Sequence, residues 1–108
     1  MADTATMEYK NLLKEHEERV KKYEDDYTQG KAEIDKMLDE VIRKAQQEAS
    51  VIAITFDKAS ADMYLLAAET AVTQMRKDGI KAIEEIRNRS MESEKLIMLG
   101  VTELYGAK

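Results

Sequence analysis

The sequence predicts an all-α protein, a helical hairpin or long-helix coiled coil that we expect to be oligomeric. Three observations support this fold class. The 108 residues include no Pro. Charged residues make up 36% of the chain, where about 25% is typical of globular domains. Apolar side chains recur at spacings of three and four residues, as in packed helices. A compact up-down four-helix bundle is the alternative.

Residues 45–75 form the only long stretch that is nearly free of charge. The charged residues within it are Glu48, Asp57, Lys58, Asp62 and Glu69. Both flanks are densely charged, so we expect this stretch to form the core of a single helical domain spanning residues 1–108. Residues 1–6 are predicted to be a frayed start, and residues 100–108 a loose or docking tail.

The first predicted helix begins near Met7, where Thr4 or Thr6 can serve as its N-cap. One face of this helix carries side chains spaced alternately four and three residues apart, which is the seam of a coiled coil. The seam residues are Tyr9, Leu13, His16, Val20, Tyr23 and Tyr27. Because the rest of the segment is polar, this narrow stripe requires a partner helix.

Gly30 is the first glycine of the chain, and we predict that it ends the first helix in a turn. The alternative is an uninterrupted helix, because the seam spacing continues through Gly30 to Ile34, Met37 and Val41. Beyond this point the apolar stripe widens into adjacent pairs, which is typical of a helix that contacts more than one neighbour.

Residues 51–56 are β-prone, but no second strand is available to pair with them, so we predict helix there as well. After them, Asp57 or Ser60 can cap a new helix, although no Gly or Pro supports a bend. Gly79 is the stronger candidate for a break. Turns at all of these positions would give the four-helix bundle, and fewer turns would give the hairpin or rod. The narrow, charged flanks favour the hairpin or rod.

We expect the apolar stripe to form the interface through which the protein self-associates. The predicted interface residues are Tyr9, Leu13, His16, Val20, Tyr23, Tyr27, Ile34, Met37, Val41, Ile52, Phe56, Met63 and Leu66. The chain also contains seven Met. They fill the core of the helices in one interpretation, and form an adaptable groove for amphipathic partner segments in the other.

The charge balance argues against nucleic acid and membrane partners. The formal net charge is −5, and the 17 basic residues are interleaved with 22 acidic ones, so no basic patch forms for nucleic acid or anionic lipid. The most apolar window, residues 51–72, is interrupted by Asp57, Lys58 and Asp62, which a membrane-spanning helix would not tolerate. The first residues lack a signal-peptide pattern, so we expect a cytoplasmic protein, or one exported without a cleaved signal.

The sequence offers no recognisable catalytic or metal-binding set. His16 is the only histidine, and no serine or cysteine pattern gives it a nucleophile to activate. The chain has no Cys, and it lacks the Glu-x-x-His pairs of di-metal bundles. A calcium loop over residues 25–36 fails because Tyr27 and Lys36 stand where oxygen ligands are required. We expect no enzyme activity, cofactor, metal or small-molecule substrate.

These features favour a non-enzymatic coiled-coil structural or interaction subunit, which self-associates and docks onto a larger protein assembly. The alternative is a small helical chaperone or inhibitor that binds one client protein through a Met-rich apolar groove. The two functions differ in the exposed apolar area that they require, and dye binding measures this area. An open groove on a folded oligomer would bind a hydrophobic dye strongly.

Overall fold

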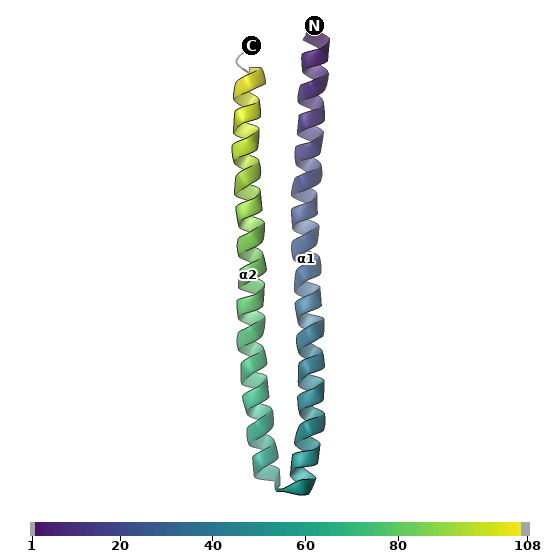
Figure 1. Ribbon diagram of the computed structural model, residues 1–108, viewed down its shortest axis with the longest axis vertical. Coiled ribbons are helices and arrows are strands. Elements are labelled where there is room, and N and C mark those ends of the chain that lie inside the picture. Colours follow the sequence, from purple (N-terminus) through teal and green to yellow (C-terminus); the bar gives the residue numbers. More distant parts are fainter. Residues whose placement is uncertain (1, 107–108) are drawn as a thin grey trace. The chain divides into compact units, whose positions relative to one another are not determined.

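The computed structural model describes residues 2–106, with side chains from Thr6 onward, and these residues are helical almost throughout (Figure 1). Helix α1 spans Ala2–Thr55 and helix α2 spans Lys58–Gly106. Phe56 and Asp57 join the two helices into a helical hairpin, and the described residues contain no strand. The predicted all-α hairpin is therefore confirmed, and the alternative of four short helices is wrong.

The connection between the helices depends on Asp57, one of the two residues predicted as a cap. The backbone N–H of Phe56 donates to the carbonyl of Ile52 at 2.8 Å, which closes the last turn of α1. The backbone N–H of Ser60 then donates to Asp57 Oδ1 at 2.6 Å, so Asp57 is the N-cap of α2. A short polar side chain thus starts the second helix without any glycine or proline.

The turns predicted at Gly30 and Gly79 are wrong, because both glycines lie inside continuous helices. Neither has a positive φ angle, so neither forms a left-handed helix cap. A Cβ at Gly30 would lie only 3.3 Å from Ile83 Cδ1, and a Cβ at Gly79 would lie only 3.3 Å from Ile34 Cδ1. The missing side chains therefore allow close packing between the helices.

The predicted frayed start and the predicted loose or docking tail are helical where the structure describes them. Helix α1 already begins at Ala2, and α2 continues through the predicted tail to Gly106. Residues 1, 107 and 108 of these segments lie outside the described residues. The Tyr105 ring packs against Tyr9, with ring centroids 5.6 Å apart, so the last turns of α2 are docked.

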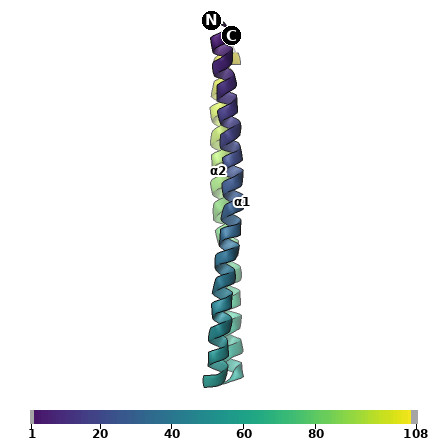
Figure 2. The ribbon, with the colours of Figure 1, turned by 90° about the vertical axis from the view of Figure 1, so that its right-hand side faces the viewer.

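The chain divides into two compact units, each containing one segment of α1 alongside one segment of α2 (Figures 1 and 2). The central unit is Gly30–Ile83, and the terminal unit combines Met1–Gln29 with Glu84–Lys108. In the described chain, the buried apolar residues all belong to the central unit: Leu38, Ala45, Ala49, Ala61 and Val72. All but Leu38 fall within the weakly charged stretch in which we expected the core.

Most buried and half-buried residues of α2 follow an eleven-residue repeat, with successive spacings of four, three and four. In the central unit these residues are Ala61, Leu65, Ala68, Val72, Arg76, Gly79 and Ile83. In the terminal unit they are Arg87, Ser90, Glu94, Met98, Val101 and Tyr105. Such a repeat averages about 3.67 residues per turn, close to the 3.6 of an ideal helix, so the seam stays on one side of α2.

Candidate functional site

The terminal unit contains a buried ionic cluster around Glu94 of α2. The Glu94 residue is only 2% exposed. Arg19 Nε donates to its Oε1 at 2.5 Å and Arg19 Nη2 to its Oε2 at 3.2 Å. His16 Nδ1 lies 2.8 Å from Oε2, and Tyr23 OH donates to Oε1 at 3.5 Å. His16 and Tyr23 of the predicted seam therefore contact the same carboxylate as Arg19, which lies beside the seam.

The partners of Glu94 keep it ionised. The hydrogen bond from Arg19 lowers the pKa of Glu94 most strongly, and the His16 contact lowers it further against the opposing effect of burial. Glu94 in turn raises the pKa of Arg19 above its ordinary value. Each Glu94 oxygen already has two partners, which fills the acceptor sites of the carboxylate. We interpret the cluster as a polar contact that aligns the two helical segments.

Glu94 was absent from the residues predicted from sequence, because the predicted interface was based on the spacing of apolar side chains. One signal could have identified it. Glu94 lies eleven residues from Ile83 and eleven from Tyr105, so it occupies the same position of the α2 repeat as two packed seam residues. A carboxylate at such a position requires a cation on the facing helix, and Arg19 provides it.

Other seam tyrosines of α1 also contact α2 of the same chain. In the terminal unit, Arg87 lies over the Tyr27 ring with its Cζ 4.1 Å from the ring centroid, which is a cation–π geometry. Arg87 Nη1 also lies 3.8 Å from Glu24 Oε2. Tyr105 OH donates to Glu8 Oε2 at 3.3 Å. The hydroxyl and cation contacts lie at the edge of the seam, as expected for tyrosines at partly hydrated interfaces.

The central unit has its own interhelical ion pairs, formed by Arg76 of α2. Its Nε lies 3.1 Å from Asp35 Oδ1, and its Nη2 donates to Asp39 Oδ1 at 3.1 Å. Arg76 and Asp35 are half-buried and Asp39 is exposed, so solvent still screens these pairs and they contribute little to the free energy of folding.

The structure separates the predicted interface residues into two groups. Residues of the α1 seam are half-buried within their own units: Tyr9, Leu13, His16, Val20, Tyr23, Tyr27 and Ile34. Ile52 is also half-buried. The other predicted residues remain exposed: Met37, Val41, Phe56, Met63 and Leu66. The first group thus serves the packing of α1 on α2, whereas the exposed group is available to another molecule.

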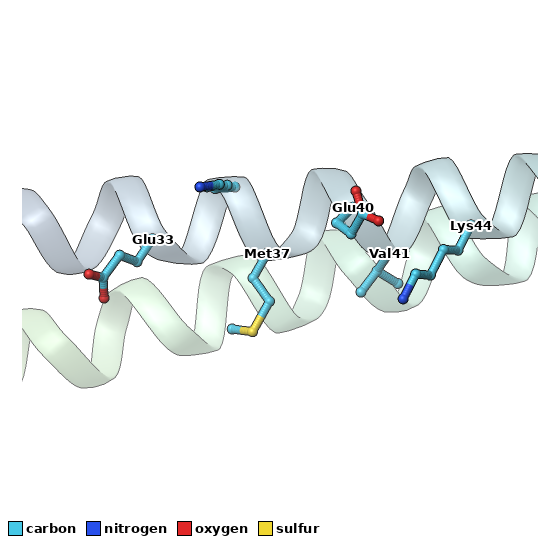
Figure 3. Close-up of a pocket in the computed structure, with 6 residues that line it drawn as sticks. Glu33, Met37, Glu40, Val41 and Lys44 are labelled. Carbon is cyan, nitrogen blue, oxygen red and sulfur yellow. The ribbon is translucent and has the colours of Figure 1, made fainter.

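A shallow groove runs along α1 in the central unit, with Met37 and Val41 at its middle. It is lined by Glu33, Lys36, Met37, Glu40, Val41 and Lys44. Figure 3 shows Met37 and Val41 projecting from one side of α1, with Glu33 and Lys44 beyond them along the helix. A second groove shares Val41 and Lys44 and adds Ala45, Glu48, Ile52, Tyr64 and Ala68. We call the residues lining these two grooves the Met37 face.

The Met37 face is apolar along its middle and charged along its borders. Met37 is 62% exposed, although it is a large apolar side chain. Val41 and Tyr64 are exposed as well. Such a contiguous apolar strip with a charged rim has the composition of a protein-binding surface.

The described residues show no sign of a metal site or a membrane span. No group of three or more His, Cys, Asp or Glu side chains in residues 6–106 is placed to hold a metal ion. Within the same part of the chain, neither helix has a stretch both long and apolar enough to cross a membrane. No protein-family model, curated protein or solved structure matches this chain.

Proposed function

We propose that this protein is a non-enzymatic structural and interaction subunit, a helical hairpin that self-associates through the Met37 face and docks onto a larger protein assembly. The observation that carries the proposal is the exposure of Met37, Val41 and Tyr64 beside a core made mainly of alanines. Large apolar side chains left on the surface in one strip are typical of interaction sites.

The energetic argument concerns what a pair of helices can bury alone. Ala45, Ala49 and Ala61 remove little apolar surface from water, so the central unit gains little from its own core. Full burial of a Val or Met side chain contributes about 1.5–3 kcal/mol. Covering Met37 and Val41 with another helix would bury two further large side chains beside Leu38 and Val72, the large members of the existing core, which supports association as the role of this face.

The proposal is tested by sedimentation velocity of the full chain at concentrations from about 1 to 100 µM, a range that covers typical transient dimers. We expect a species of at least twice the 12.3 kDa of one chain. The double substitution M37E/V41K, which preserves net charge and helix-forming residues, should shift the protein towards monomer.

A matched control keeps the same kinds of substitution but moves them away from the Met37 face. Met7 and Ile86 are apolar residues of the terminal unit that are at least as exposed as Met37 and Val41, so M7E/I86K should leave the mass unchanged. A wild-type protein that stays monomeric at every concentration would contradict the proposal.

A second candidate function is the binding of one client protein by a monomeric hairpin. The exposure of Met63 and Met75 in addition to Met37 favours it, because flexible thioether side chains adapt to different apolar partners. A monomer that binds a hydrophobic dye strongly, and loses this binding in M37E/V41K, would support client binding over self-association.

A further inference from the structure

We propose that the Met37 face binds the same face of a second copy of this chain around a twofold axis, with the two α1 helices antiparallel. This inference rests on the proposed self-association and specifies its geometry. It follows from the order of charges beside the groove, which is set by residues that line the groove itself.

The charges along the groove alternate in sign. Going along α1, the order is Glu33, Lys36, Glu40 and Lys44. These residues are spaced three, four and four apart, so they lie on one side of the helix together with Met37 and Val41. The groove therefore presents an apolar centre with an acidic, basic, acidic, basic sequence along its border.

An antiparallel pairing makes this border complementary to itself. A twofold axis near Leu38 places Glu33 of one copy opposite Lys44 of the other. The same axis places Lys36 opposite Glu40, and Met37 opposite Val41. Because the symmetry repeats each pair, four opposite-charge pairs flank one continuous apolar contact, which is an isologous interface.

A parallel pairing lacks these contacts. A twofold axis that runs along the helices would turn this charged border of one copy away from the same border of the other, so the four opposite-charge pairs would be lost. The alternating order of signs thus selects the antiparallel arrangement, in the way that charged border residues set orientation in coiled coils.

The existing contact of Glu40 is compatible with this pairing. Glu40 forms an ion pair with Arg43 of the same helix, with Arg43 Nε 3.0 Å from Glu40 Oε2. Its side chain is nevertheless about half exposed, and a carboxylate has enough acceptor sites for a second cation. The hydrogen bond from Arg43 also lowers the pKa of Glu40, so the charge needed for pairing with Lys36 persists at neutral pH.

Orientation is tested by cross-linking, since the chain has no cysteine of its own. Chains carrying E33C and chains carrying K44C should cross-link to each other through a short bismaleimide when mixed. E33C alone should not, because two copies of residue 33 would be about 16 Å apart along the axis. Efficient cross-linking of E33C to itself would indicate a parallel pair and overturn the inference.

Charge complementarity is tested with two variants of opposite sign. K36E/K44E makes the groove border entirely acidic, and E33K/E40K makes it entirely basic. Each variant alone should dimerise at least about tenfold more weakly than the wild type. A one-to-one mixture of the two should recover association, and so should the chain with all four signs reversed. Circular dichroism verifies that each variant remains helical.

The outcomes separate this inference from the proposed function. A wild-type oligomer whose affinity is unchanged in both charge variants would overturn the antiparallel pairing and leave self-association through other contacts standing. A wild-type monomer whose Met37 face binds a hydrophobic dye would overturn both the antiparallel pairing and the self-association. It would indicate that the Met37 face binds a different protein.

Discussion

Gly30 and Ile83 face each other in a contact that is repeated by Gly79 and Ile34. In each case, a Cβ built on the glycine would lie 3.3 Å from the isoleucine Cδ1 on the other helix. Each isoleucine also follows the glycine of its own helix by four residues, so the arrangement in the central unit is reciprocal. Each isoleucine fills the space that a side chain on the opposite helix would occupy.

The reciprocal contact predicts that G30A will be nearly neutral. Ala gains up to about 1 kcal/mol over Gly in a helix interior, but its methyl group must displace Ile83 Cδ1. We expect a change in the free energy of unfolding within about 1 kcal/mol. The variant I83V alone should lose about 0.5–1.5 kcal/mol. The double variant G30A/I83V should be more stable than the sum of both changes, because Val lacks Cδ1.

Gly100 provides the matched control for this experiment. Among the described residues, no atom beyond the local helix backbone lies within 4 Å of the position that its Cβ would occupy, so G100A should stabilise the protein by about 0.5–1 kcal/mol. Chemical denaturation monitored by circular dichroism measures all four variants. Equal stabilisation by G30A and G100A would show that the Gly30–Ile83 contact does not limit packing.

Arg19 is predicted to be the residue on which the Glu94 cluster depends. The substitution R19M would leave a buried carboxylate without its strongest donor, so we expect the melting temperature to fall by about 10 °C. The matched control is R43M, which removes the exposed Arg43–Glu40 pair and should have little effect. The double variant R19M/E94L should recover much of the loss, since both charges are then gone. Equal melting temperatures of R19M and R43M would contradict this role.

The cluster also predicts a pH dependence of stability. Since folding lowers the pKa of Glu94 below its ordinary value of 4.5, its contribution is fully present above about pH 4.5 and disappears as the pH falls through the lower folded value. Thermal unfolding of wild type and E94Q should therefore differ at neutral pH and converge in acid. The comparison with E94Q removes effects from Glu40 and Asp57, whose pKa values are also lowered. If the melting temperatures of wild type and E94Q differ by a constant amount down to about pH 2.5, the predicted contribution of ionised Glu94 is contradicted.

Asp57 is predicted to be required for the start of α2. Its Oδ1 accepts the Ser60 backbone N–H, and this bond lowers the pKa of Asp57. We expect D57A to lower the melting temperature by about 5 °C. D57N keeps an oxygen acceptor while removing the charge, and should retain most of the stability. If D57A and D57N lower the melting temperature by the same amount, the charge of Asp57 matters and its role as a cap does not.

The fold class was predictable because it depends on local patterns. The seam from Tyr9 to Tyr27 has helical periodicity, and Asp57 is a common N-cap residue. The roles of Gly30 and Gly79 were not predictable in the same way, because glycine both ends helices and permits close packing. Only the facing residue decides between these roles, and Ile83 is distant in the sequence.

The candidate sites were predictable only in part. The wide stripe containing Met37 and Val41 indicated contact with more than one neighbour, but periodicity cannot assign one stripe to α2 and another to a second molecule. Glu94 was missed because a charged residue on a packed seam depends on its partner Arg19, and the pairing of the helices is not visible in either segment alone. Long-range pairing therefore limits such predictions.

The most direct test of the account is concentration-dependent oxidation of Met37 in the unmodified chain. Met37 is 62% exposed and Met7 is 64% exposed in the single chain, so hydrogen peroxide should convert both to sulfoxide at similar rates when the protein is dilute. Mass spectrometry of proteolytic fragments measures the two rates separately. We predict that Met37 becomes protected as the concentration rises while Met7 does not. Equal oxidation of both methionines at every concentration would contradict a second copy bound at the Met37 face.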